Sequence, residues 1–100
     1  MSRLDRAAIA ASLTAKLDAS PDPDGAADLL AKNGRIAIAA TPAEIDPAIA
    51  RLKPLDGYRW LAINGADLFG ASPKTIGTKV GILDATGRVL KAADLPRPKV

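Results

Sequence analysis

The sequence contains no histidine, no cysteine and no glutamine, only one glutamate (Glu44), and three aromatic residues (Tyr58, Trp60 and Phe69). Without histidine and cysteine, no imidazole can activate a nucleophile and no thiolate can hold a metal ion. The absence of cysteine also excludes disulfides. Because general acid–base catalysis relies mainly on histidine and glutamate, we expect no enzyme activity, no catalytic residue, no cofactor and no metal site.

Long apolar runs are missing as well. No stretch approaches the ~20 consecutive apolar residues that a membrane-spanning helix needs. Residues 1–11 carry Arg3, Asp5 and Arg6 and lack the apolar stretch of a signal peptide. We therefore expect a cytoplasmic protein that does not contact a membrane.

The apolar residues that are present suffice for one small core. They make up 48% of the 100 residues, although many are alanines that bury little area. Pro96 and Pro98 forbid helix and central strand near the end of the chain. The sequence predicts a single compact domain over residues 1–94 and an extended basic arm over residues 95–100.

The first segment, residues 3–18, reads as a helix with two apolar faces and Ser2 as its N-cap. Helical spacing puts Ile9, Leu13 and Leu17 on one face. The opposite face holds Leu4, Ala8, Ala11 and Ala15. A helix with two such faces can lie between two neighbours. The second neighbour is either another part of this chain or another protein.

The next elements are predicted from helix-capping residues, turn residues and the alternation of side chains along strands. We expect a loop over residues 19–25, a short helix over 25–32 that ends at Asn33 and Gly34, and a strand over 35–40. Thr41 and Pro42 begin a helix that extends to residue 52, and Glu44 is expected to complete a capping box. A strand over 58–63 follows, and Asn64-Gly65 indicates a hairpin turn.

Strands dominate the second half of the prediction. Residues 66–69 form either a short return strand or a turn with Leu68 and Phe69 directed inward, and residues 70–74 form a loop. Strands over 75–83 and 87–92 make a hairpin with its turn at 84–87, and Ile76, Val80 and Ile82 face the core. Gly77 and Gly81 mark a bulge or the close approach of another backbone. The fold class is α+β: N-terminal helices on a small, mostly antiparallel sheet with one βαβ crossover, a C-terminal hairpin and a tail.

Two motifs fail as sites for a ligand. Asp22 and Asp24 lie in a Pro-Asp-Pro-Asp-Gly loop that lacks the later acidic residues of a calcium-binding loop, so we assign them to turns and caps. Residues 70–75 resemble a phosphate-binding loop only superficially, because the second glycine before Lys74 is missing.

Charge is uneven along the chain. Residues 1–50 hold five basic and seven acidic side chains, a formal charge of −2, whereas residues 51–100 hold nine basic and four acidic ones, a charge of +5. The basic half either keeps a small protein soluble or binds an anionic partner. In the second case it is a nucleic-acid-binding surface around Tyr58, Trp60 and the 75–92 hairpin, formed by Arg51, Lys53, Arg59, Lys79, Arg88 and Lys91.

The function that we expect first is protein–protein interaction. The second apolar face of the first helix and the terminal arm both offer contact surface. The residues predicted to bind a partner are Leu4, Ala8, Ala11, Ala15, Leu95, Arg97 and Lys99. Such a chain suits a homo-oligomer or a structural subunit of a larger assembly, such as a virion component, an adaptor or an inhibitor.

Overall fold

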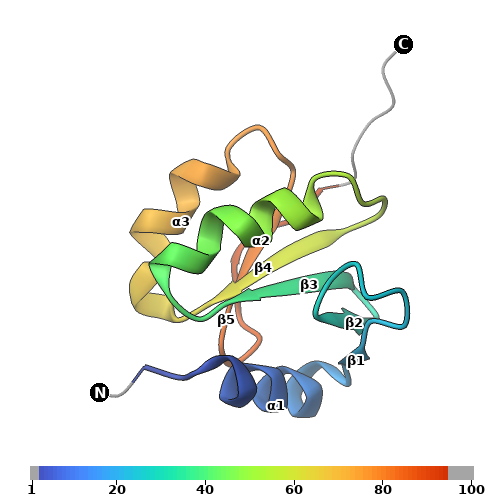
Figure 1. Cartoon of the computed structure of the whole chain (residues 1–100). Helices are drawn as coiled ribbons and strands as arrows, with labels where there is room; N and C mark the ends of the chain where they lie inside the picture. The colour runs from blue at the N-terminus through green and yellow to red at the C-terminus, as the bar shows by residue number, and fades with distance from the viewer. Residues whose placement is uncertain (1–2, 95–100) are drawn as a thin grey trace.

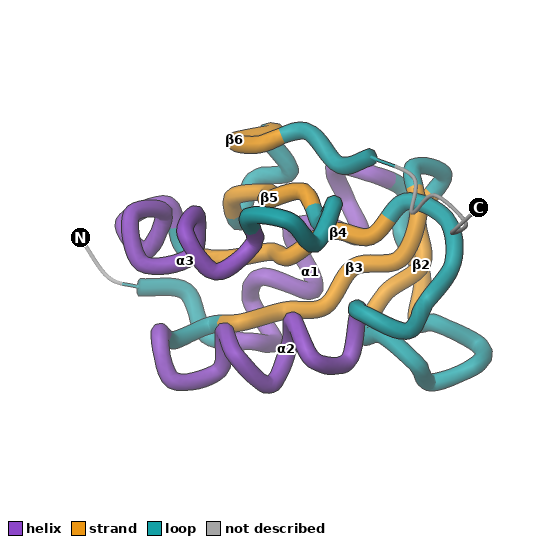
Figure 2. The backbone as a smooth tube through the Cα atoms, turned by 90° about the horizontal axis from the view of Figure 1, so that it is seen from above, coloured by secondary structure: helices purple, strands orange, loops and turns teal. Residues whose placement is uncertain are grey.

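Six strands lie side by side in one mixed sheet, in the order in which they occur in the chain (Figures 1 and 2). The computed structural model describes residues 3–94. The strands are β1 (Ser20–Pro21), β2 (Leu29–Ala31), β3 (Gly34–Ala39), β4 (Arg59–Ile63), β5 (Gly81–Asp84) and β6 (Val89–Lys91). The pairs β3–β4 and β4–β5 are parallel and the other three pairs are antiparallel, which confirms the predicted α+β class.

Helices cover both faces of this sheet (Figure 1). Helix α1 (Arg6–Leu17) lies on one face, while α2 (Ile45–Leu52) and α3 (Leu68–Thr75) lie on the other. Because side chains alternate along a strand, β3 and β4 supply both cores. Those facing α1 are Ile36, Ile38, Trp60 and Ala62, and those facing α2 and α3 are Ala37, Ala39, Leu61 and Ile63.

The predicted crossover from β3 through α2 to β4 is confirmed. A 3₁₀ turn, η1 (Pro42–Glu44), begins at Thr41 and continues into α2. The Thr41 side chain caps no backbone N–H; its hydroxyl donates instead to the Glu44 carboxylate at 2.9 Å. Glu44 therefore reaches back to Thr41 as expected, and the Thr41 backbone N–H also contributes to the lowered pKa of Glu44, but the other half of the capping box, in which the Thr41 side chain accepts from a backbone N–H, is missing.

The predicted helix over residues 25–32 is wrong, because part of that segment is strand β2. The Asp22 carboxylate accepts hydrogen bonds from the N–H groups of Asp24 (3.1 Å) and Ala27 (2.9 Å), which fixes the preceding residues in a loop. The loop delivers β2 to its antiparallel partner β3. Gly34 begins β3 with φ 128°, and a Cβ there would lie 2.1 Å from the Tyr58 carbonyl oxygen. Asn33 and Gly34 thus belong to a hairpin and not to a helix end.

The hairpin predicted at Asn64-Gly65 is also wrong. Asn64 has extended backbone angles (φ −71°, ψ 136°), whereas the tight hairpin turn that Asn-Gly favours needs positive φ. A 3₁₀ turn, η2 (Gly65–Asp67), follows and leads directly into α3. The segment 70–74 is therefore helical and not a loop, with Pro73 inside it. The sheet gains a second parallel crossover, β4–α3–β5.

The long strand predicted over residues 75–83 shrinks to β5, and Ile76 is exposed, contrary to the expectation that it faces the core. Val80 and Ile82 are buried as predicted. The turn at 84–87 is confirmed, since the Gly87 N–H donates to the Asp84 carbonyl at 3.0 Å. The close approach of another backbone is confirmed at Gly81, where a Cβ would lie 2.6 Å from the Ala93 backbone nitrogen, but not at Gly77, where a Cβ would meet nothing within 4 Å.

Candidate functional site

The outward side of α3 carries the two most exposed large apolar side chains of residues 3–94. Phe69 is 90% exposed, so the turn in which it would be directed inward is wrong, and Ile76, at the end of the helix, is 72% exposed. They are seven residues apart with Pro73 between them, a spacing that places all three on one side of a helix. We call Phe69, Pro73 and Ile76 the α3 face.

Contacts on its inner side fix the orientation of α3. Ala71 and Thr75 are buried, and Leu68 packs against the core shared with α2. The Thr75 hydroxyl donates to the Ser72 carbonyl at 2.9 Å and accepts from Lys91 Nζ at 2.8 Å. Because the inner side is filled, Phe69 cannot turn inward without expelling buried side chains. Its exposure is a property of the packed fold.

Lysines gather near the C-terminal end of α3. Lys74 Nζ lies 2.9 Å from both carboxylate oxygens of Asp46, at the start of α2. Lys79 Nζ lies 3.9 Å from an Asp94 oxygen, a loose ion pair. Lys91 Nζ donates to the neutral Thr75 hydroxyl. The end of the α3 face is thus bordered by positive charge that is only partly neutralised.

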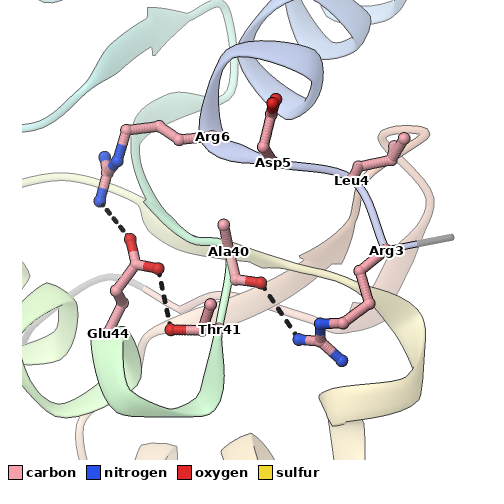
Figure 3. A pocket seen from close by; sticks show the side chains of 7 residues that line it. All are labelled: Arg3, Leu4, Asp5, Arg6, Ala40, Thr41 and Glu44. Carbon is pink, nitrogen blue, oxygen red and sulfur yellow. Dashed lines mark hydrogen bonds and ion pairs between the residues drawn. The ribbon is translucent and has the colours of Figure 1, made fainter.

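A pocket of about 330 Å³ lies elsewhere, beyond the carboxyl end of β3 (Figure 3). In open α/β sheets this is the usual edge for ligands. The residues that line it are Arg3, Leu4, Asp5, Arg6, Ala40, Thr41 and Glu44.

The charges of this pocket are paired with one another. Arg6 binds Glu44 (2.8 Å) and Asp28 (3.0 Å), and Arg3 binds the Asp67 carboxylate and the Ala40 carbonyl oxygen (3.1 Å). The Thr41 hydroxyl, followed by the Arg6 guanidinium, lowers the pKa of Glu44. Since every guanidinium already has a carboxylate partner, the pocket is an internal clamp and offers little to an ionic ligand.

Asn64 completes this clamp. Its amide nitrogen donates to the carbonyl oxygens of Leu4 and Ala40, each at 3.0 Å, and its amide oxygen accepts from the Leu4 N–H at 3.0 Å. One buried side chain thereby ties the segment before α1 to the ends of β3 and β4. The role of Asn64 could not be read from the sequence, because its partners are 24 and 60 residues away.

The predicted partner-binding residues of α1 are only partly brought together. Ala11 and Ala15 are exposed, Ala8 is half-buried, and Leu4 lies before the helix at the rim of the pocket. This leaves an open but shallow apolar strip on α1, because alanine presents little surface. Three further predicted residues, Leu95, Arg97 and Lys99, lie outside the described residues.

The predicted nucleic-acid surface loses its central residue. Arg59 is 2% exposed, and its guanidinium donates to the carbonyl oxygens of Leu52, Lys53 and Thr78 at 3.3, 3.1 and 2.7 Å. Arg59 therefore cannot reach a phosphate, and its assignment to this surface is corrected. Trp60 is buried too, and its indole N–H donates to the Asn33 carbonyl at 3.0 Å.

The other basic residues of that surface are dispersed. Arg51 pairs with Asp28 at 3.3 Å, Lys79 lies near Asp94, and Lys91 binds Thr75. Lys53 and Arg88 are exposed, one after α2 and the other before β6. The aromatic side chain left for stacking is Tyr58, which is partly exposed. The arrangement lacks a continuous basic groove lined by aromatic rings.

Comparison of the chain with protein-family models, with curated proteins and with solved structures finds no significant match. Between residues 3 and 94, no three acidic side chains come together as a possible metal site. Within the same range, no helix has the length and apolar character to cross a membrane. The α3 face is thus the surface feature that most needs a functional explanation.

Proposed function

We propose that this chain is a non-enzymatic protein-binding module that uses the α3 face to contact another protein. The observation that carries the proposal is the exposure of Phe69 on α3 and of Ile76, the residue that ends it, while the inner side of the helix is packed against the core. Burying such a side chain in a partner is worth roughly 1.5–3 kcal/mol. Aromatic side chains on rigid elements are typical anchors of protein interfaces.

The open strip of α1, with Ala11 and Ala15, is a second contact in this proposal and suits close approach of another helix. An adaptor or a subunit of a larger assembly would use both surfaces, because α1 and α3 lie on opposite faces of the sheet (Figure 1). Nucleic-acid binding has less support, since Arg59 and Trp60 are buried and most remaining cations have intramolecular partners.

Site-specific crosslinking tests the proposal. A photoreactive phenylalanine analogue would replace Phe69 in one variant, Ala11 in a second variant that reports on the α1 strip, and the exposed Ala50 of α2 in a control variant, and all three would be irradiated in the native source. We expect a discrete protein adduct from position 69 that is absent without irradiation. With the purified partner, Phe69→Ser should then weaken binding by about 30-fold, the effect of losing roughly 2 kcal/mol at an anchor.

Two results would count against the α3 face. An adduct from position 11 alone would move the interface to α1. Partner binding that Phe69→Ser leaves unchanged would show that the crosslink reports proximity and not a contact that contributes to affinity.

A further inference from the structure

The cations beside the α3 face are not equally neutralised, and this difference indicates what the partner carries. Lys74 has both oxygens of Asp46 within 2.9 Å, so its charge is matched. Lys79 lies 3.9 Å from Asp94, beyond hydrogen-bond distance. For Lys91, no carboxylate of residues 3–94 lies within 4.0 Å of Nζ, which donates to the neutral Thr75 hydroxyl at 2.8 Å.

The two lysines are connected to the end of α3 in different ways. Lys91 reaches Thr75, the residue before Ile76. Lys79 is three residues after Ile76, and its carbonyl oxygen accepts from the N–H of Asp94, three residues beyond the end of β6, at 3.0 Å. Lys91 is half-buried, so its ammonium has given up part of its hydration without gaining an anion.

We infer, on the basis of the proposed function, that the α3 face binds an acidic amphipathic segment of a partner protein. Two large apolar side chains of that segment pack on Phe69 and Ile76, and an Asp or Glu carboxylate pairs with Lys91, whose Nζ lies at Thr75, while Lys79 adds positive charge at this end of the α3 face. Seven helical residues span about 10 Å, so the two apolar anchors of the partner lie at positions i and i+7 of a helix, which face the same side. The carboxylate follows the anchor that meets Ile76.

The structure favours this partner over an anionic lipid surface. Helix α3 is only eight residues long. Asp46 is exposed beside Lys74 and would be pressed against anionic headgroups if the α3 face entered a membrane interface. A protein segment can place its own charges around Asp46, whereas a lipid headgroup layer cannot.

A displayed library of random peptides, selected on the purified full chain, tests this inference. We expect the enriched peptides to carry two large apolar residues at the stated spacing with a neighbouring Asp or Glu. Amide NMR shifts on titration with one such peptide should map to Phe69, Ile76 and Lys91. The variant Lys79→Gln/Lys91→Gln should weaken binding by about 5- to 20-fold, and the affinity should fall as salt is raised.

The control variant is Lys16→Gln/Lys32→Gln, which removes two exposed lysines from the α1 side of the chain and from the β2–β3 turn and should leave binding unchanged. Peptides that need Phe69 but are neutral or basic overturn the acidic partner and leave the proposed function standing. Peptides that ignore Phe69→Ser, or recovery of no peptide, overturn both. Phe69-dependent binding to phosphatidylserine vesicles, with no peptide selected, assigns the surface to a membrane and overturns the inference.

Discussion

Replacing the buried Arg59 with methionine should destabilise the fold strongly. The guanidinium lies where three chain segments end: the last residue of α2, the turn after it, and the loop that follows α3. Carbonyl oxygens at the C-terminal ends of helices lack intrahelical partners. Arg59 supplies donors to them without any carboxylate in hydrogen-bonding contact. Burial lowers the pKa of this guanidinium, and the Asp56 charge partly opposes that effect.

The cost can be estimated from the acceptors. Methionine keeps most of the side-chain volume, so the change is mainly the loss of three hydrogen bonds. The hydrogen bond to Leu52 is buried, so leaving the Leu52 carbonyl unpaired should lower the free energy of unfolding by about 1–3 kcal/mol. The carbonyls of Lys53 and Thr78 are partly accessible to water, so losing each of these hydrogen bonds should lower the free energy of unfolding by less, about 0.5–1 kcal/mol. Arg59 Nε is buried without a hydrogen-bond partner, so removing it relieves an unfavourable burial and offsets part of this destabilisation.

The net expectation is a loss of about 3 kcal/mol, which in a domain of this size lowers the melting temperature by roughly 10–20 °C. Urea unfolding followed by circular dichroism would measure it. Arg59→Lys should fall in between, because an ammonium reaches fewer of the carbonyls. Arg88→Met, on an exposed residue, is the matched control and should stay within about 0.5 kcal/mol of wild type. If Arg59→Met were as stable as that control, the guanidinium would not hold the helix ends together.

Three further predictions can be checked on the isolated chain. Gly81→Ala forces a Cβ to within 2.6 Å of the Trp60 ring and should cost about 1–3 kcal/mol in urea unfolding, whereas Gly70→Ala, with open space around it, should stabilise α3 by about 0.5–1 kcal/mol. The pKa of Asp22 is lowered, first by a backbone N–H of its own loop, so its stabilising effect is present above the unfolded pKa of about 3.9 and is lost as pH falls through the lower folded value. The stability gap between wild type and Asp22→Asn should therefore narrow below about pH 4, and a gap that is constant with pH would contradict this. Phe69→Ser should change the free energy of unfolding by no more than about 0.5 kcal/mol, because Phe69 is 90% exposed. A large drop in the melting temperature would show that Phe69 belongs to the core.

The secondary-structure elements that depend on residues close together in the sequence could be predicted from it. The strands β3 and β4 alternate side chains between two buried faces, and this pattern is visible in residues 35–40 and 58–63. The turn at 84–87 depends on Asp84, whose carboxylate accepts from the N–H groups of Thr86 (2.9 Å) and Arg88 (3.0 Å). Helix α1 was also predicted, although Asp5 and not Ser2 is its N-cap.

The elements that depend on contacts with residues far away in the sequence could not be predicted. Asn64 is held by Leu4 and Ala40 and is therefore unavailable for the hairpin turn that Asn-Gly normally forms. Helix α3 contains Gly70 and Pro73, which argue against a helix locally, and it exists because Ala71 and Thr75 pack on the sheet.

The candidate site was missed for the same reason. Once residues 68–75 are known to be helical, Phe69, Pro73 and Ile76 follow as one face from their spacing alone. The burial of Arg59 depends on three carbonyl oxygens that only the tertiary fold brings together. From the sequence alone, its charge therefore indicated a residue on the protein surface.

The most direct test of the central claim is the affinity of the crosslinked partner, once purified, for wild type and for Phe69→Ser, measured by titration calorimetry. We predict that Phe69→Ser weakens binding by about 30-fold while the melting temperature is unchanged. The matched variant Ala50→Ser, at an exposed position of α2 outside both proposed contact surfaces, should bind within about twofold of wild type. Equal affinity of Phe69→Ser and wild type would contradict the assignment of the α3 face as a protein-binding surface.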